Sequence, residues 1–510
     1  MSSQIADAAD AMVSGSSDLV VLDGVGFGVA DVVRLADGDA RPVPGTDAMK
    51  RAAESWDAAR QIAATGRVYG RSTGVGANRN EDVPTEAAAE HGLRLLRSHA
   101  GAIGDELPAR EVRAMLAVRA NQLLAGGAGL RPTVVTALCE ALESGVYPAV
   151  NEFGSVGTGD IAALAQVGLA LVGERSWRGT GRDSVGVPEP QPLDNNDALA
   201  LISSNALTLG QSALALHELR GLIGATQVVG ALSLLAVDGS HEPFAAPVHA
   251  ARPHRGSVEV ARRMRELIGA ADRPTPPLGR IQDPYGFRCL PQIHGPAHDA
   301  ADALEEVLAI EINAAAENPF ISAEDMTAYH HGGFYQAQLA LALDHFRLAL
   351  TQVARLSTSR LSSLNEPSFT RLKPFLADNE PASSGVMILE YAAAAALGDL
   401  RAFSAPASLG HAVLSRGVEE QASFASLAAR QTLRACRAYR LVVGCELVAA
   451  VRALRQRDLR PEPELPVGRA LELAESVLDD ETADRPLTDD VTAAAGLLDR
   501  FTEIWRGSTS

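Results

Sequence analysis

The chain has 510 residues and contains 45 Lys and Arg against 63 Asp and Glu, which gives a formal net charge of −18. A chain this acidic lacks the basic face with which nucleic-acid-binding proteins displace counterions, so no nucleic-acid partner is expected. Hydrophobic residues make up 46% of the chain and charged residues 21%, which excludes a disordered protein. Only 4% of the residues are aromatic, so Leu, Ala and Val must form the core, as is typical of close-packed helices.

Targeting and redox features of the sequence favour the cytoplasm. The first residues, Met1–Asp7, contain no basic segment ahead of an apolar one, so no signal peptide is expected. We take Ile161–Gly173 as the longest mildly apolar stretch, and it is too short to span a bilayer, so no membrane association is expected. The four cysteines are scattered and show no Cys-x-x-Cys spacing, which indicates neither a disulfide framework nor a zinc site.

Two glycine-rich segments lie in the first third of the chain. Val68–Gly76 places Tyr69 among three glycines, a composition typical of a mobile loop that can carry a side chain over a pocket. Gly154–Asp160 also has three glycines, and an apolar run follows it directly. This run predicts a helix with Thr158 or Asp160 as its N-cap.

Helical periodicity dominates the rest of the chain. Apolar residues recur at steps of three and four over Phe334–Ser363, and Glu419–Arg457 has the same pattern without a proline. Ala300–Ala316 continues the pattern. We therefore predict a mainly α fold with a long central helical bundle. Residues 1–200 form the part with the two glycine loops, and residues 201–510 form the bundle and the C-terminal helices.

The segment Gly154–Asp160 resembles the motif of the aromatic amino acid ammonia-lyases and aminomutases, whose best-known member is histidine ammonia-lyase. In that family an Ala-Ser-Gly triplet cyclises and dehydrates into an electrophilic methylidene-imidazolone. Further family blocks match Gly239–Gly256 and Gln282–Gln292 in the same order, so the resemblance runs from about Tyr69 to Glu420. It implies a histidine/phenylalanine ammonia-lyase-like fold and a homotetramer whose active sites draw on three chains.

The electrophile segment departs from the family by one missing residue. Anchored at Asp160, the triplet becomes Gly157-Thr158-Gly159, and anchored at Gly154, its serine is missing. Gly159 permits the close approach that ring closure needs, and Thr158 has a hydroxyl to lose. The product would carry an extra methyl group, and the shorter loop would move it. We expect no prosthetic group; the alternative is a modified electrophile made from these three residues.

The resemblance assigns catalytic roles to two tyrosines. Tyr69 matches the family's catalytic tyrosine, and a phenol with a pKa near 10 removes a proton only where cations or helix ends stabilise its phenolate. Tyr285 matches a second tyrosine of the same pocket. Arg288 matches the arginine that pairs with the substrate carboxylate, a role that suits a planar guanidinium. His99 follows a serine as in the histidine-specific branch, which favours a polar group on the substrate.

Four further positions match residues that line the substrate pocket. Gln282 matches a residue that lines the same pocket as the family arginine. Phe334 matches the phenylalanine that packs near the electrophile, and Glu419 matches the glutamate that faces the substrate amino group. Ser203 aligns with an asparagine that helps to hold the electrophile. Asn205 lies two residues later, on another face of a helix, and cannot simply replace that asparagine.

Histidine pairs could suggest a metal site. The candidates are His330 with His331 and His294 with His298, and Gly295 and Pro296 make a helix around the second pair doubtful. No third ligand stands at a recognised spacing, so no metal is expected.

Three functions remain open from the sequence, because a fold alone does not fix a function. The favoured hypothesis is an enzyme of this fold without the usual prosthetic group. It would use Tyr69 in elimination, addition or ring closure on an amino-acid-derived carboxylate in secondary metabolism. The second hypothesis is a true ammonia-lyase or aminomutase with a modified electrophile. The third is a non-catalytic homologue that binds a ligand or partner.

Overall fold

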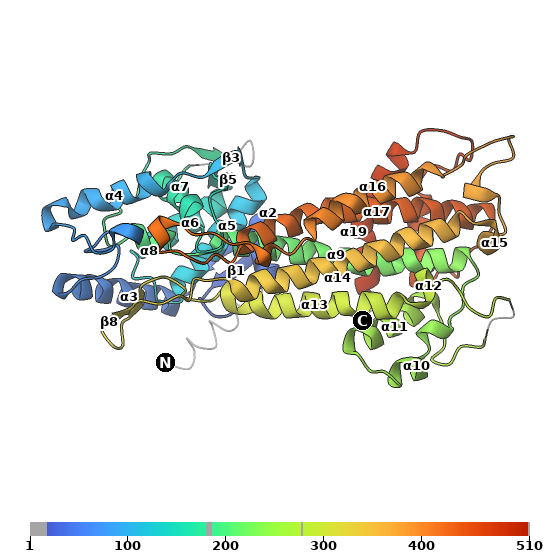
Figure 1. The fold of residues 1–510 in the computed structure, drawn as a ribbon, viewed down its shortest axis with the longest axis horizontal. Helices are drawn as coiled ribbons and strands as arrows, with labels where there is room; N and C mark the ends of the chain where they lie inside the picture. Colours follow the sequence, from blue (N-terminus) through green and yellow to red (C-terminus); the bar gives the residue numbers. More distant parts are fainter. Residues whose placement is uncertain (1–17, 180–185, 277–278, 508–510) are drawn as a thin grey trace, which may run out of the picture. The chain divides into compact units, whose positions relative to one another are not determined.

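Helices dominate the computed structural model, which describes residues 18–179, 186–276 and 279–507 (Figure 1). Strands in this described part form four two-stranded pairs, so the predicted mainly α fold class is confirmed. The segment Met1–Asp7, on which the expectation of no signal peptide rests, lies outside the described residues.

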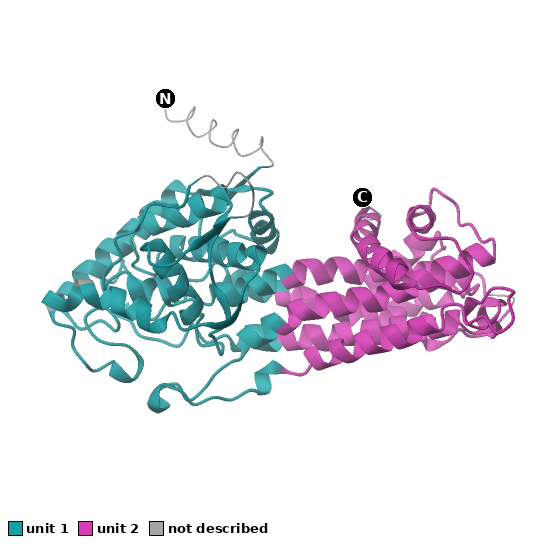
Figure 2. Ribbon diagram, turned by 90° about the horizontal axis from the view of Figure 1, so that it is seen from above, with its two compact units in different colours: residues 1–214, 305–341, 407–430 teal, residues 215–304, 342–406, 431–510 magenta. Residues whose placement is uncertain are grey.

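The chain divides into two compact units, each assembled from three stretches of sequence (Figure 2). Unit 1 comprises Met1–Leu214, Glu305–Leu341 and Ala407–Arg430. Unit 2 comprises Ala215–Leu304, Ala342–Pro406 and Gln431–Ser510. The division of the chain into residues 1–200 and 201–510 stays a prediction.

Unit 1 combines short helices with small strand pairs. Its helices are α2 (Val29–Asp37), α3 (Thr46–Thr65), α4 (Ala88–His99), α5 (Ala109–Leu124), α6 (Thr133–Ser144), α7 (Ile161–Leu171), α8 (Ala198–Ile202), and the 3-10 turns η1 (Gly76–Asn78), η2 (Thr85–Ala87), η5 (Ala407–Leu409) and η6 (Ser415–Gly417). Its strands are β1 (Leu19–Leu22) paired in parallel with β2 (Arg41–Pro44), and the antiparallel pairs β3 (Ile103–Glu106) with β5 (Asn151–Phe153), β4 (Val146–Pro148) with β6 (Trp177–Gly179), and β7 (Phe320–Ser322) with β8 (Thr327–Tyr329).

Long helices form the core of unit 2. Four of them also contribute residues to unit 1: α9 (Ala206–Ala236), α13 (Leu290–Glu311), α14 (Ala337–Leu364) and α17 (Ala425–Gln456). Within unit 2 these helices lie side by side (Figures 1 and 2). The remaining elements of unit 2 are α10 (Ala246–Ala250), α11 (Arg255–Ile268), α12 (Tyr285–Arg288), α15 (Pro367–Thr370), α16 (Ile388–Phe403), α18 (Pro466–Glu475), α19 (Thr488–Gly507), η3 (Glu242–Phe244) and η4 (Pro374–Leu376).

Two sequence-based expectations about helices were wrong. Residues 290–311 form one continuous helix with Pro296 inside it, so His294 and His298 do share a helical face. The helix expected from Glu419 begins at Ala425 instead, after Phe424 with a left-handed φ of +54°. Periodicity cannot detect either case, because one lost backbone bond or one turn residue leaves the apolar pattern intact.

The longest apolar stretch was also misjudged. The helical stretch Ala198–Ala236 is long and apolar enough to cross a membrane, and exceeds Ile161–Gly173 in length. Of its most apolar window, 89% is buried inside the protein, so core packing accounts for its composition.

Helix α5 positions two walls of the site described below. Arg119 on this helix is 1% exposed and pairs with Glu317, which is 2% exposed, at 2.7 Å. The same guanidinium donates to the backbone oxygen of Leu201 in α8 at 3.1 Å and to that of Ala200. Because a charge removed from water must be paired, this buried arginine fixes α8 and the segment around Asn318.

Candidate functional site

Unit 1 contains a cavity of about 340 Å³ at which several loops meet. Its walls come from the Tyr69 loop, the Gly154–Asp160 loop, α8, the segment between α13 and α14, and the loop before α17. The lining residues are Tyr69, Gly76, Arg79, Thr158, Gly159, Ile161, Leu199, Ser203, Ser204, Asn318, His330, Phe334, Val418 and Glu419. The cavity therefore brings together Tyr69, two residues of the altered triplet, and the predicted pocket residues Ser203, Phe334 and Glu419.

The Tyr69 hydroxyl is held at the cavity by its own loop. It accepts a hydrogen bond from the backbone N–H of Gly76 at 2.8 Å. Burial raises the pKa of this phenol above its ordinary value, the Gly76 bond and Arg79 lower it, and Glu419 raises it. Tyr69 is therefore a neutral phenol at neutral pH, a form that can donate a proton.

Glu419 lies in a hairpin that contacts the Tyr69 loop. Leu414 and Glu419 exchange backbone hydrogen bonds of 2.8 and 3.3 Å. At the hairpin turn, Ser415 Oγ accepts from the N–H of Ala77 at 3.1 Å, and a Cβ on Gly76 would lie only 2.7 Å from this oxygen. Because Gly76 also has a φ of +55°, the close approach of the two loops depends on a glycine at this position.

The loop after Gly154 is fastened from both sides. Asp160 is 1% exposed, and its carboxylate accepts from the N–H and the hydroxyl of Thr208 at 2.8 and 2.9 Å. Asp160 is the N-cap residue of α7, as predicted, although its side chain makes no capping hydrogen bond to that helix. The buried carboxylate holds the first turn of α9 instead.

Gly157 lies in a left-handed conformation with a φ of +87°. Ser423 Oγ donates to its carbonyl oxygen at 2.7 Å. A Cβ at Gly157 would lie 2.2 Å from Ser423 Oγ and 2.8 Å from the nitrogen of Phe424. The first residue of the altered triplet is therefore packed so tightly that an alanine does not fit there.

Ser203 and Asn205 lie between α8 and α9 in a segment that is not helical, so the expectation about helical faces does not apply to them. Ser203 lines the cavity, and its Oγ accepts from the N–H of Asn318 at 3.0 Å. Asn205 is 1% exposed and donates to the backbone oxygen of Phe334 at 2.8 Å from outside the cavity lining. Asn205 thus supports the backbone of a cavity residue without taking the place of Ser203.

Besides Gly157, four predicted site residues do not line this cavity. His99 is in the last turn of α4, where its Nδ1 lies 2.9 Å from the oxygen of Leu95. Gln282, Tyr285 and Arg288 belong to unit 2, in or just before α12. Tyr285 is 67% exposed, and the guanidinium carbon of Arg288 lies 4.3 Å from the centre of its ring.

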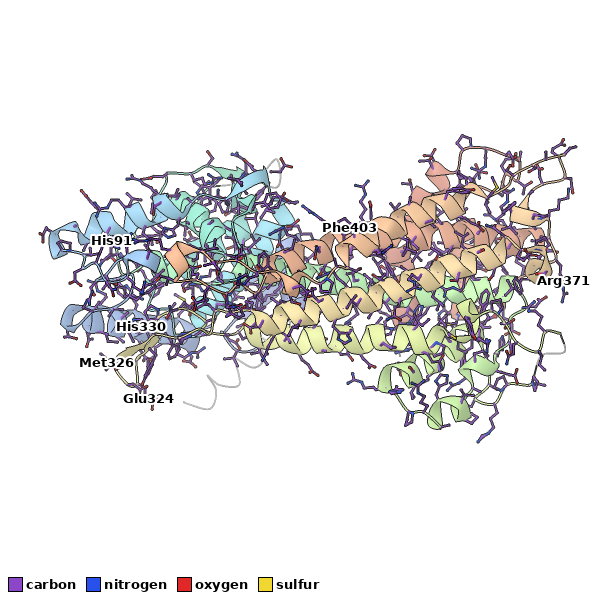
Figure 3. The ribbon with its side chains drawn as sticks, in the orientation of Figure 1. His91, Glu324, Met326, His330, Arg371 and Phe403 are labelled. Atoms are coloured by element: carbon purple, nitrogen blue, oxygen red, sulfur yellow. The ribbon has the colours of Figure 1, made fainter. Side chains whose placement is uncertain are left out.

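Sequence reasoning missed four polar residues of the cavity, which are Arg79, Ser204, Asn318 and His330. Arg79 lies in the same loop as Tyr69, three positions after Gly76, and its position in a glycine-rich loop was the available signal. His330 follows β8 (Figure 3), and its Nε2 lies 3.4 Å from the backbone nitrogen of Tyr69. From the sequence, His330 was considered only as a metal ligand. No cluster of three potential metal ligands occurs within the described ranges, and metal binding stays untested.

Comparison with known proteins defines the class of the fold. A structure of ergothionase from Treponema denticola superposes with a TM-score of 0.88 and 26% identity, covering 96% of this chain and 99% of the other. A structure of tyrosine aminomutase from Streptomyces globisporus superposes with a TM-score of 0.88 and 27% identity, and the match covers 96% of this chain and 98% of the other. The fold is therefore the histidine/phenylalanine ammonia-lyase and aminomutase fold, as the sequence predicted.

Sequence comparison identifies the family. A model described as aromatic amino acid lyase matches residues 27–476. Histidine ammonia-lyase from Geobacillus kaustophilus is 35% identical over 452 residues, which cover 86% of this chain and 89% of the relative. The chain belongs to the aromatic amino acid lyase family, and it is an enzyme of the carbon–nitrogen lyase type.

Proposed function

We propose that the protein is an ammonia-lyase-superfamily enzyme that works without the normal methylidene-imidazolone. It uses Tyr69 as acid and base in elimination, addition or cyclisation on an amino-acid-derived carboxylate. The observation that carries this proposal is the placement of the Tyr69 hydroxyl in one cavity with Thr158 and Gly159, the shortened triplet. Relatives named for histidine and tyrosine support an amino-acid-like substrate.

The residues at the triplet do not fit the family's prosthetic group. Ring closure would consume the carbonyl oxygen of Gly157, which accepts a hydrogen bond from Ser423. The family's alanine cannot occupy this left-handed and crowded position. Loss of water from Thr158 would leave a methyl group on the exocyclic carbon, which hinders attack. No step of the proposed reaction therefore passes through an electrophile.

The chain's own groups can bind the substrate and move one proton. The carboxylate of Glu419 is suited to a substrate ammonium group, which it would hold by a charge-assisted hydrogen bond. The neutral phenol of Tyr69 can donate its proton to a substrate carbon or leaving group, and its phenolate can accept the proton in the reverse direction. Phe334 supplies an apolar contact in the same wall.

We further propose a homotetramer in which Gln282, Tyr285 and Arg288 complete the active site of another copy. These residues do not line the cavity of their own chain, and an exposed tyrosine stacked with an arginine is suited to recognition at an interface. Helix α16 supports association, since Ile388 and Tyr391 are 57% and 66% exposed. Light scattering is expected to give four times the chain mass at micromolar concentration, and a monomer mass contradicts this proposal.

We place the enzyme in the cytoplasm and in secondary metabolism. None of the four cysteines, which all lie within the described ranges, forms a disulfide, as is usual in reducing compartments. The changes at Thr158 and Ser203 indicate chemistry other than histidine breakdown. Neighbouring genes for natural-product assembly would agree with this assignment, and a histidine-degradation operon would contradict it.

Intact-protein mass spectrometry tests the missing prosthetic group. We expect the mass of the unmodified chain, because ring closure with dehydration would remove two waters. Thr158→Ala is expected to retain most of the activity, since no dehydration of that residue is required. A mass lower by two waters together with an inactive Thr158→Ala variant would establish the alternative, an ammonia-lyase or aminomutase with a modified electrophile.

A further inference from the structure

The charged groups that face Tyr69 come from separate segments of unit 1. Within the described part of the chain, Arg79 and Glu419 are the charged residues that line the cavity. His330 adds a titratable ring, edge-on to Tyr69 with 6.4 Å between the ring centres. Burial raises the pKa of Tyr69 most, the Gly76 N–H and Arg79 lower it, and Glu419 raises it. Arg79 is therefore the one side chain among these that favours the phenolate.

A single turn fixes Arg79 relative to the Tyr69 hydroxyl. The N–H of Gly76 donates to Tyr69 Oη at 2.8 Å, and Nη1 of Arg79 donates to the carbonyl oxygen of the same glycine at 3.4 Å. The backbone N–H of Arg79 also donates to this carbonyl, at 3.2 Å, and closes the turn η1. The two side chains thus converge on opposite ends of one residue, and Ser415 Oγ holds the next residue by accepting from the N–H of Ala77 at 3.1 Å.

The other two arginines of this loop are already engaged. Arg71 is 2% exposed and donates to the backbone oxygens of Ala128 and Gly129 at 2.8 and 3.2 Å. Arg67 forms an ion pair with Asp82 at 2.7 Å. For Arg79, the described residues provide only the long bond to Gly76 and no ion pair. The charge of Arg79 is therefore available to the cavity.

We propose that Arg79 is a positioning residue that stabilises the negative charge on Tyr69 Oη whenever this oxygen is without its proton. The inference rests on the proposed function, in which Tyr69 is the acid and base. In one direction a substrate C–H bond breaks, its electron pair stays with the substrate, and the proton goes to Tyr69 Oη. In the other direction the O–H bond breaks and the phenolate remains. Arg79 acts on the phenolate state in both cases.

Titration of tyrosinate absorbance in the full-length protein tests this inference without a substrate. Subtracting the titration of Tyr69→Phe from that of the wild type isolates the signal of Tyr69. Arg79→Gln is expected to move this titration to higher pH by roughly half to one unit, since one nearby charge is lost. Arg79→Lys keeps the charge and should move it less. Arg67→Gln is the matched control, because it removes the same charge from the same loop outside the cavity.

The possible results separate the inference from the proposed function. An unchanged Tyr69 titration in Arg79→Gln, or an equal shift in Arg67→Gln, overturns the role of Arg79. Full activity of Tyr69→Phe overturns the acid/base function and leaves the titration result standing. Arg79 is exposed, so its variants are expected to fold, and equal thermal melting of Arg79→Gln and Arg79→Lys checks this.

Discussion

Charged side chains are paired in the buried core of unit 2, whereas those that line the cavity of unit 1 form no ion pair with each other in the part of the chain that the structure describes. In unit 2, Arg360 and Glu446 are both 0% exposed and form two hydrogen bonds of 2.6 and 2.8 Å. Ser233 and Ser357 donate to the same carboxylate at 2.7 and 2.5 Å. In the cavity, Arg79 and Glu419 form no ion pair with each other within the described residues.

The difference separates a structural role from a functional one. A buried carboxylate with four donors has no capacity left, so the Glu446 cluster joins α9, α14 and α17 and binds nothing else. The cavity leaves a phenol, a guanidinium and a carboxylate without full partners, which is the state in which they can meet a substrate.

Tyr69→Phe removes only a hydroxyl from the cavity. We expect turnover to fall by about 10²–10⁴-fold with unchanged folding, which is the usual contribution of general acid–base catalysis. Steady-state kinetics on the identified substrate, with a melting curve as the control for folding, measure this effect. Wild-type turnover would remove Tyr69 from the mechanism.

Arg360→Met breaks the buried pair of unit 2. We expect a loss of roughly 3–5 kcal/mol in the free energy of unfolding, because the carboxylate of Glu446 stays buried but no longer has a positive charge beside it. Arg500→Met is the matched control, since Arg500 and its partner Glu503 are 62% and 68% exposed, and it should cost less than about 1 kcal/mol. Equal losses in urea denaturation would contradict the structural role of the cluster.

Arg288→Ala tests whether unit 2 also contributes to the active site of another copy. We expect substrate binding to weaken by about 2–4 kcal/mol, the cost of losing a desolvated charge-assisted pair. Arg288→Lys should also be impaired, because an ammonium cannot reproduce the planar fork. Calorimetry measures the binding, and wild-type affinity in Arg288→Ala would exclude a carboxylate-binding role.

The histidines of α13 predict acid sensitivity in unit 2. Burial lowers the pKa of His298 to about 4, despite an opposing effect of Asp302, and lowers that of His294 well below its ordinary range. A histidine whose pKa is lowered by folding contributes its full stability when the pH is above its pKa in the unfolded chain, which is near 6.5. This stability is lost as the pH falls from there towards 4. Because of His298, the free energy of unfolding should therefore fall by about 2 kcal/mol between pH 7 and pH 5.

Urea denaturation at these two pH values measures the loss. His298→Gln should reduce the difference between the two midpoints. His254→Gln should leave it unchanged, because His254 is exposed. A pH dependence that is undiminished in His298→Gln would assign the acid sensitivity to other groups, His294 included.

The sequence predicted the architecture well where the evidence was local or came from several motifs in order. The apolar period over Phe334–Ser363 gave the helix α14, whose first residue is Ala337, and the motif order gave the family. Helix boundaries were less certain, because the left-handed residue Phe424 delays the start of one helix and Pro296 does not interrupt another, and neither effect changes the apolar pattern.

The site was predicted in part for a related reason. Tyr69, Ser203, Phe334 and Glu419 came from motif matches, and they do meet in one cavity. Arg79 and His330 were not predicted, because their role depends on which loops fold against Tyr69. No motif encodes that contact.

By itself the sequence determined the helical class, the family, and a triplet that lacks one residue. These are properties of residue order and local periodicity, which need no knowledge of distant contacts. Only the tertiary structure decided that Ser423 donates a hydrogen bond to the carbonyl oxygen of Gly157. It also decided that Arg79 donates to the carbonyl oxygen of Gly76, the glycine whose N–H donates to Tyr69. Residues 157 and 423 are far apart in sequence, so their contact is set by the packing of the whole unit.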